Sequence, residues 1–452
     1  MRRGRRQTLT AAQKKLPAYR LRTIYDDSVR FVCEHRDEYI VDPSKQFTRR
    51  SRKLSFEDML RFMVSMYSGT INREIINYFG AANGPCRAAF IRRRRQIRPE
   101  AFRALYDMFN ANSCRWDRRR FRGRMLYAVD GTGIRVAKNP DSPTFHANTR
   151  TGGENLLHLN ALYDIMNKTY ADYTVQACQE QDERLAGQEM LGKLDSSEKS
   201  IVLFDAGYQG YYQVEFLNRL RNIDYVIRAK KSSFKVLRLI PDEEHDSWYE
   251  VQIRTTQRNC DKELFEKGLA VYVPGPSKFG KDKKSTTWHF ETPCTIRFRA
   301  VKFRLDTGEW ETLITSLPED EFSLSDMKDL YHRRWGIETS FRDLKLNLGL
   351  EKLHTRDENL VLQEIAARMV LFNLCMRIIL NTTPERWYGP KWASQPGFSD
   401  SIYLCREWMW DNEPPPDERM FRRYKQPIRP DRSDPRNIRL KTFPYFNYRT
   451  AA

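Results

Sequence analysis

The feature that most constrains the fold is the order of apolar segments between residues 125 and 227. Three segments with the composition of β-strands come first, and a helix, a strand, a second helix and a last strand follow them. Segments in this order build a mixed sheet with helices packed on it, so we expect an α/β (α+β) fold. The segments are Met125–Val129, Leu157–Tyr163, Thr169–Val175, Asp182–Leu194, Ser200–Phe204, Tyr212–Leu220 and Tyr225–Ile227.

The rest of the sequence divides at changes of pattern. A basic, helical region comes first, and short alternating segments that predict a β-rich antiparallel insertion interrupt the strand-and-helix region. Beyond the insertion, a strand, a charged helix and a strongly apolar helix precede a basic tail rich in proline and tryptophan, for which we expect little regular structure. Insertion strands are expected over 248–253, 269–273, 286–290 and 295–303. The five regions are residues 1–118, 119–234, 235–306, 307–383 and 384–452.

A large excess of basic residues indicates a polyanionic partner. The sequence has 78 Lys and Arg against 59 Asp and Glu, a net charge of +19 spread along the chain, and nucleic acid is the leading candidate. Because no run of about 18 apolar residues occurs, we expect no membrane partner. Four consecutive arginines without an acidic neighbour favour a DNA backbone contact over a solvated surface; they are Arg92, Arg93, Arg94 and Arg95.

Two short helices are predicted in the basic N-terminal region, one on each side of Gly69–Thr70. This arrangement fits a DNA-binding helix-turn-helix, and it fits a small helical bundle equally well. The spacing of cysteine and histidine is also informative, because the eight cysteines form no CxxC pair and the seven histidines form no HxxxH pair. A structural zinc site is therefore not expected, and any metal would be held by carboxylates, which suits Mg²⁺ or Mn²⁺.

A helix after the insertion carries charged residues on a single face. At steps of three, four and seven residues, Tyr331, Arg334, Glu338 and Lys345 lie together on one continuous helix. An apolar stripe on another face would be buried. Ordinary surface ion pairs would give the same pattern, so the function of this face depends on what it meets. The stripe consists of Leu330, Ile337, Phe341, Leu344 and Leu348.

Two aspartates earlier in the chain are candidates to meet Glu338. Asp130 and Asp205 each follow an apolar strand and precede a glycine, where a strand end exposes its side chain at the sheet edge. The three carboxylates could hold two Mg²⁺ ions, with Mn²⁺ as a substitute, for phosphoryl transfer. An Asp before Gly is more often a turn residue. We interpret Asp164 as such a turn residue and Asp172 as a surface residue.

The charged helix resembles the signature of DDE transposases of the insertion-sequence-four family. That signature is Tyr, two residues, Arg, three residues, Glu, six residues and Lys. Tyr331, Arg334, Glu338 and Lys345 reproduce it without a gap.

The two aspartates resemble the first and second catalytic aspartates of the same family. Asp130 stands in Val-Asp-Gly-Thr and Asp205 in Phe-Asp-Ala-Gly-Tyr. Many relatives have Arg where this chain has Ala206, so one cation near the second aspartate is missing. The resemblance extends from about residue 55 to about residue 380.

The resemblance implies an RNase H-like catalytic core built from residues 119–234 and 307–383. It implies that Asp130, Asp205 and Glu338 are the catalytic metal ligands for Mg²⁺. It also implies cut-and-paste transposition of double-stranded DNA through hairpinned ends, in a synaptic complex that is a homodimer.

The same resemblance implies further DNA contacts. Tyr331, Arg334 and Lys345 would hold the terminal phosphates. Trp310 resembles a tryptophan that stacks on a flipped base, and core packing is its alternative. Arg228 resembles a DNA-contacting arginine, and a plain charge at the sheet edge is its alternative. We interpret Trp335 as a packing residue.

The expected function is a cytoplasmic, nucleoid-associated transposase that nicks element ends, forms hairpins and transfers strands. Two alternatives remain. One is a nuclease or resolvase of the same fold, and the other is a DNA-binding descendant without enzymatic activity. The presence of all three acids weighs against the descendant without activity, and joined donor and target DNA would distinguish a transposase from a nuclease. A Glu338 far from both aspartates would exclude the proposed site.

Overall fold

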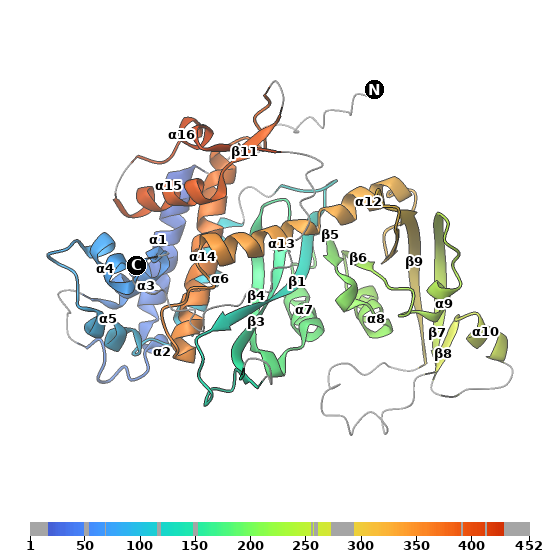
Figure 1. Cartoon of the computed structure of the whole chain (residues 1–452), viewed down its shortest axis with the longest axis horizontal. Coiled ribbons are helices and arrows are strands. Elements are labelled where there is room, and N and C mark those ends of the chain that lie inside the picture. Colours follow the sequence, from blue (N-terminus) through green and yellow to red (C-terminus); the bar gives the residue numbers. More distant parts are fainter. Residues whose placement is uncertain are drawn as a thin grey trace.

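The computed structural model describes residues 17–48, 54–67, 69–114, 119–147, 152–254, 256, 261–272, 293–389, 392–411 and 414–428. In Figure 1, a large mixed sheet extends from the middle of the molecule to one end, and the N-terminal helices gather at the other end. The described chain is therefore a mixed α/β protein with an N-terminal helical region.

The strands of the sheet are β1 (Met125–Val136), β2 (Phe145–His146), β3 (Glu154–Asp164), β4 (Thr169–Ala177), β5 (Ser200–Phe204), β6 (Ile223–Arg228), β7 (His245–Arg254), β8 (Ala270–Tyr272), β9 (Cys294–Arg304) and β10 (Trp310–Thr315). Their order is β2-β3-β1-β5-β6-β10-β9-β7-β8, and β4 pairs with β3. β1, β5 and β6 run parallel to one another, so their carboxyl ends meet at one edge of the sheet. The three strands predicted to be neighbours, β1, β3 and β4, are confirmed as antiparallel neighbours.

Two expectations about the strands need correction, and a third is not tested. β1 does not end at Val129 but continues through Asp130 to Val136, because its pairing with β3 continues after its pairing with β5 stops. The segments expected as an antiparallel insertion extend the same sheet, and β8 runs parallel to β7. The strand expected over 286–290 lies outside the described residues.

The helices are α1 (Ala18–Glu34), α2 (Arg36–Tyr39), α3 (Phe56–Ser65), α4 (Ile71–Phe79), α5 (Arg87–Arg94), α6 (Glu100–Ser113), α7 (Glu183–Gly192), α8 (Tyr211–Arg219), α9 (Lys235–Arg238), α10 (Lys262–Glu266), α12 (Leu324–His332), α13 (Trp335–Arg342), α14 (Glu358–Thr382), α15 (Phe398–Asp411) and α16 (Glu418–Arg423). α7 and α8 cover one face of the sheet, where Val129 of β1 packs with residues of both helices. α12 and α13 cover the opposite face, where Leu203 packs with Leu330 and Ala128 packs with Ile337.

α14 is the central helix of the N-terminal end. α3, α6 and α1 pack against it, and so does α15 from the C-terminal region (Figure 1). The helix is long and apolar enough to cross a membrane, but 83% of its most apolar window is buried inside the fold, as in a core helix. The prediction of a buried apolar helix is confirmed.

The region after residue 384 is more regular than expected. Within its described residues, α15, α16 and the short paired strands β11 (Ser394–Pro396) and β12 (Lys425–Pro427) are formed. α15 packs against α14, and its Cys405 and Trp408 are buried in the core. This burial explains why the segment contains apolar residues. Only the basic, proline-rich composition was apparent from the sequence.

Candidate active site

Asp130 and Asp205 lie side by side at the carboxyl edge of the parallel strands. Val129 and Phe204 are partners in the parallel pairing of β1 and β5, so the next residue of each strand falls at the same level. Side chains alternate between the two faces of a strand. Because Ala128 and Leu203 face the helices α12 and α13, the two aspartates project from that same face.

Local backbone contacts hold both carboxylates. Asp130 Oδ1 accepts a hydrogen bond from the Gly131 N–H at 2.8 Å, and Asp205 Oδ1 accepts one from the Gly207 N–H at 2.7 Å. Asp205 is the N-cap of a short 3₁₀ turn, Ala206–Tyr208, and so it also serves as a turn residue. The glycine that follows each aspartate therefore has a structural role beside the acid.

The charged stretch that carries Glu338 is not one continuous helix. α12 ends at His332, and α13 begins at Trp335. Between them the backbone bonds tighten to i→i+3, including Ile337 N–H to Arg334 O at 3.1 Å, and a turn of π-helix, Asp343–Asn347, follows α13. The apolar stripe is nevertheless buried as predicted.

Arg334 brings Glu338 and Asp130 together. Its Nη2 lies 2.6 Å from Glu338 Oε1 and its Nη1 lies 3.5 Å from Asp130 Oδ2. The guanidinium also lies over the ring of Tyr331, with 5.8 Å between Cζ and the ring centroid. Glu338 is therefore close to the first aspartate, and the condition on which the interpretation of the sequence depended is met.

The three carboxylates form one electrostatic cluster. The pKa of Asp130 is raised to about 7, first by burial and then by the charges of Asp205 and Glu338. The Gly131 N–H and Arg334 act in the opposite direction and are outweighed. A cluster of this kind is stabilised by added positive charge, and Arg334 supplies part of it.

The donor set fits a divalent cation of the Mg²⁺ class, which prefers carboxylate oxygens. In the described part of the chain, however, no three His, Cys, Asp or Glu side chains are close enough to hold one ion together. Arg334 bridges Asp130 and Glu338 in the conformation described here. The residues that would hold the metal are Asp130, Asp205 and Glu338, once this guanidinium turns to another anion.

Two buried polar atoms beside the carboxylates have no hydrogen-bond partner among the described residues. They are the hydroxyl of Tyr331 and Nε of Arg334. As whole residues, Tyr331 is 5% exposed and Arg334 is 6% exposed. Buried donors without a partner are costly, and they are common where a ligand is absent. Both residues belong to the face predicted to hold phosphate.

Lys345 lies apart from this cluster. It is half-buried in the π-helical turn, and no ion pair or hydrogen bond within the described chain joins it to the three carboxylates. Burial lowers the pKa of its amino group, and its electrostatic neighbours are Glu351 and Arg135. It lies seven residues after Glu338, which is about two helical turns further along.

Arg228 and Trp310 lie at the same edge of the sheet and share a pocket of about 500 Å³. Arg228 ends β6, Trp310 starts β10, and the pocket continues to Ala206, directly after Asp205. Trp310 is half-buried, and Nζ of the buried Lys302 lies 5.5 Å from its ring centroid. The pocket therefore places an aromatic side chain and several cations next to the second aspartate.

The structure contradicts the predicted DNA contact of Arg94, which is buried, whereas the contact predicted for the half-buried Arg93 stays a prediction. Arg94 is 1% exposed, and its guanidinium pairs with Glu364 at 2.8 Å and donates to Gln363 Oε1 at 2.9 Å. Arg93 lies over the ring of Phe47 at 3.7 Å and donates to a backbone carbonyl. The acidic partner comes from α14, far along the chain, so no neighbour in the sequence revealed it. Arg92 and Arg95 are exposed.

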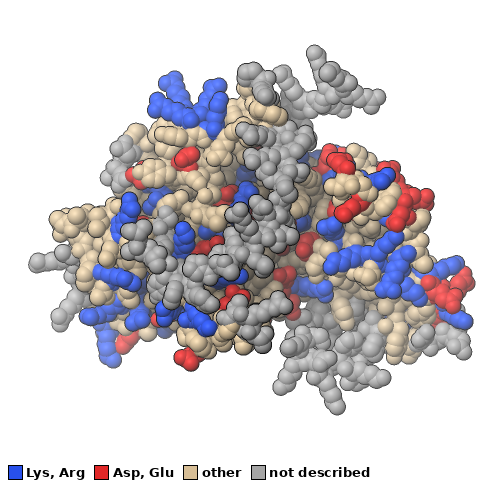
Figure 2. All heavy atoms as spheres, viewed as in Figure 1, with Lys and Arg blue, Asp and Glu red and all other residues tan. Residues whose placement is uncertain are grey.

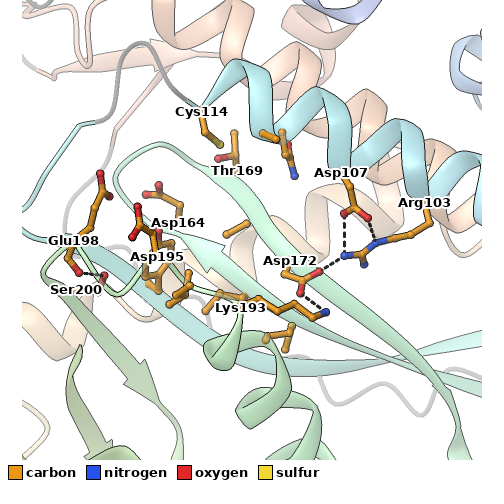
Figure 3. A pocket seen from close by; sticks show the side chains of 17 residues that line it. Arg103, Asp107, Cys114, Asp164, Thr169, Asp172, Lys193, Asp195, Glu198 and Ser200 are labelled. Atoms are coloured by element: carbon orange, nitrogen blue, oxygen red, sulfur yellow. Dashed lines mark hydrogen bonds and ion pairs between the residues drawn. The ribbon is translucent and has the colours of Figure 1, made fainter. Parts of the chain in front are cut away.

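The two acids set aside as structural have different environments. Asp164 is a turn residue as predicted, because Oδ1 accepts from the Met166 and Asn167 N–H groups at 3.1 and 2.9 Å. Asp172 is not a surface residue: it is 7% exposed and pairs with Arg103 and Lys193. Figure 3 shows both acids in a pocket of about 330 Å³, which lies at the opposite edge of the sheet from Asp130.

Three residues near the site were missed or misread in the sequence. Glu311 and Lys302 line the pocket of Trp310, and no spacing pattern distinguished them from other strand residues. Trp335 was interpreted as a packing residue, but it is 49% exposed and lies 5.7 Å from the Arg334 guanidinium. Its place in the signature, next to Arg334, was the only available signal.

Comparison with known proteins places the chain in a family. The model of the transposase DDE domain, an RNase H-like nucleotidyl transferase, matches residues 121–374, which is more than half of the chain. The transposase for insertion sequence element IS421 of Escherichia coli is 41% identical over 58 residues. InsL of insertion sequence element IS186A, from Escherichia coli (strain K12), is similar to the same degree.

These alignments are short, since they span 13% of this chain and 16% of the length of each relative. A solved structure of the piggyBac transposase synaptic complex with hairpin DNA is 11% identical in sequence, with a TM-score of 0.41. The superposition covers 93% of this chain and 78% of the piggyBac chain. A TM-score below 0.5 does not establish a shared fold. The family rests on the domain match, and by that match the chain belongs to the transposase DDE domain family.

Proposed function

We propose that this chain is a cut-and-paste DNA transposase of the insertion-sequence-four group, acting by metal-dependent phosphoryl transfer. The observation that carries the proposal is the proximity of three carboxylates at one sheet edge: Arg334 bridges Asp130 and Glu338, and Asp205 lies beside Asp130. Transposases of the DDE family are typically metal-dependent. The RNase H-like core and its division into residues 119–234 and 307–383 belong to the same proposal.

Asp130, Asp205 and Glu338 would hold two Mg²⁺ ions, with Mn²⁺ as a substitute. When bound, the ions supply activation of a water or 3′-hydroxyl and stabilisation of the leaving oxygen. The chain's own residues would orient the DNA strand. Arg334 offers a planar fork to a phosphate and Tyr331 a neutral donor, and both have a buried atom without a partner. Lys345 would contact the strand further along.

The pocket beside Asp205 would receive a displaced nucleotide during hairpin formation. Trp310 provides a π-face for a base, and Arg228 provides a cation for a phosphate. Trp335 is exposed beside Arg334 and could stack on a second base or sugar. Each of these roles is supported by position at the same edge as the carboxylates.

The partner would be double-stranded DNA, bound by a homodimer in the synaptic complex. On the face in Figure 2, Lys and Arg are distributed over both halves of the molecule. This distribution and the net charge of +19 support binding along an extended polyanion. Arg92 and Arg95 remain candidates for phosphate contacts, and a cytoplasmic, nucleoid-associated location follows from the same proposal.

The test is a comparison of Glu338→Gln with Asp141→Asn on DNA that carries the flanks of the coding sequence. Glu338→Gln should abolish end cleavage in Mg²⁺ while DNA binding in the absence of metal is retained, because it removes one metal ligand and keeps the side-chain volume. Asp141 is an exposed acid away from the site, so its substitution should leave cleavage unchanged. Unchanged cleavage by Glu338→Gln would remove Glu338 from the site.

The products of the same assay separate the proposed function from its alternatives. A transposase yields hairpinned ends and donor DNA joined to target DNA, whereas a nuclease or resolvase of the same fold yields no transposon end joined to target DNA. A DNA-binding protein without activity would retain binding and cleave nothing, even as wild type.

A further inference from the structure

Glu311 is a buried acid at the edge of the sheet that carries the candidate active site. It is the second residue of β10 and is 8% exposed. Arg228 is opposite Leu313 in the pairing of β6 and β10, and Leu313 packs with Leu330 on the α12 face. Because Glu311 is two residues before Leu313, it projects from the same face as Arg228.

The closest partner of Glu311 is Arg228. Their Oε2 and Nε atoms are 3.2 Å apart, while the Arg228 side chain is 49% exposed. Glu311 is thus the buried end of the pair and Arg228 the exposed end. Among the described residues, Glu311 is the one carboxylate within ion-pair distance of Arg228.

The influence of Glu311 extends to the phosphate-binding face. Burial raises its pKa, and Arg228 and Arg334 lower it by their charges. The charge of Glu311 in turn contributes to raising the pKa of the Tyr331 hydroxyl, after burial. Glu311 therefore interacts electrostatically with Arg334 and Tyr331 as well as with Arg228.

Stability is a weak explanation for such a pair. An ion pair with one exposed member contributes little to stability on average. A buried acid is better explained here by what it does to Arg228. Because Glu311 meets the guanidinium at Nε, the terminal amino groups stay available, and their planar fork suits bidentate recognition of phosphate.

We propose that Glu311 is a positioning residue, which holds the guanidinium of Arg228 in the orientation that binds a DNA phosphate beside Asp205. This inference rests on the proposed function, because it requires that the chain binds DNA at this edge. It assigns a role to a residue outside the transposase signature.

The sign of the effect on DNA binding distinguishes this role from a simple charge effect. A carboxylate near DNA repels phosphate, so removing its charge should tighten binding if repulsion is all that it contributes. Removing a positioning residue should have the opposite effect on DNA binding. Losing its acceptor should weaken binding, and a substitute that retains an acceptor should preserve it.

The experiment uses Glu311→Leu and Glu311→Gln in the full chain, each with Arg228 and with Arg228→Ala. The probes are a labelled duplex from the DNA flanking the coding sequence and an unrelated duplex, titrated without divalent metal at several salt concentrations. We expect Glu311→Leu to weaken binding of the flanking duplex about tenfold and Glu311→Gln to weaken it less, since Gln retains an acceptor.

In the Arg228→Ala background, neither substitution at Glu311 should weaken binding further. Arg228→Ala itself should reduce the salt slope of binding by about one. Circular dichroism melting of each variant provides the folding control, and Glu311→Gln preserves side-chain volume if Glu311→Leu folds poorly.

Each contrary result has a distinct meaning. Tighter binding by both variants, or an equal loss with and without Arg228, would overturn the positioning role and leave the proposed function standing. Failure of the wild-type chain to bind either duplex would overturn both.

Discussion

Gly131, next to Asp130, is under a tight steric constraint. A Cβ atom on Gly131 would lie 2.1 Å from Nε2 of His158, which forms an ion pair with Glu183 at 2.9 Å. Two residues further along the same strand, a Cβ on Gly133 would meet nothing within 4 Å. The two glycines of Asp-Gly-Thr-Gly thus have different roles, although the sequence presents them alike.

Gly131→Ala should therefore disturb β1 where it carries Asp130. We expect it to lower the free energy of unfolding by about 1–3 kcal/mol through overpacking against His158, and to reduce end cleavage. Gly133→Ala is the matched control and should change stability by less than about 1 kcal/mol. Denaturant unfolding and a cleavage assay of both variants provide the measurement, and equal tolerance of the two would refute the steric argument.

At the scale of elements, α12 begins with a capped turn that precedes Tyr331 and Arg334. Ser323 and Asp326 form a capping box, in which the Ser323 N–H donates to Asp326 Oδ2 at 3.1 Å. Asp326 also pairs with Arg122 from the segment before β1. The capped helix leads to Tyr331 and Arg334, so its first turn anchors both residues relative to the sheet.

Loss of this cap should destabilise α12 without replacing any residue of the candidate active site. Ser323→Ala should cost about 1 kcal/mol in the free energy of unfolding, because it leaves an N-terminal N–H without its acceptor. Ser325→Ala, an exposed position within the same helix, should cost nothing measurable. Thermal melting of the two variants compares them, and an equal shift would mean that the cap is unimportant.

At the scale of the whole molecule, a buried ionic cluster ties the N-terminal helices to α14. Arg94 of α5 pairs with Glu364 of α14, and Glu364 Oε2 lies 3.0 Å from His354 Nδ1. His354 Nε2 lies 2.9 Å from the carbonyl of Gly69, between α3 and α4. The cluster therefore joins the N-terminal helices to segments that follow Glu338 in the sequence.

Arg94→Ala should destabilise the fold by about 3 kcal/mol, because it removes from the buried Glu364 the arginine that pairs with it directly. Although burial alone would raise the pKa of Glu364, His354 and Arg94 hold it well below its ordinary value. A carboxyl with a lowered folded pKa stabilises the fold above its unfolded pKa of about 4.3, and this stabilisation is lost as pH falls. The difference between wild type and Arg94→Ala should therefore be largest near neutral pH and shrink in acid.

Arg92→Ala is the matched control for this prediction. Arg92 is exposed two residues earlier in the same helix, so its loss should change stability by less than about 0.5 kcal/mol at any of these pH values. Unfolding of both variants is followed from neutral pH down through the unfolded pKa of about 4.3, because the stabilisation by Glu364 begins to be lost there. A loss for Arg92→Ala as large as for Arg94→Ala would contradict the assignment of Arg94 to the core.

The sequence by itself determined the features that depend on neighbouring residues and on periodicity within one element. The order of strands and helices, the buried stripe from Leu330 to Leu348 and the capping boxes all follow from periodicity and neighbouring residues. The acids Asp130 and Asp205 were found by their place after apolar strands, because parallel strands bring their carboxyl ends to one edge. The resemblance of the signature then linked them to Glu338.

Only the tertiary structure decided which charges meet. Arg94 was read as a DNA contact, because its acid is Glu364, 270 residues away in the chain. Glu311 was not distinguished at all, because its partner Arg228 is on another strand. Trp335 was misread because burial on a tightened turn does not follow helical periodicity. Periodicity describes one element at a time, whereas ion pairs and burial depend on how separate elements pack.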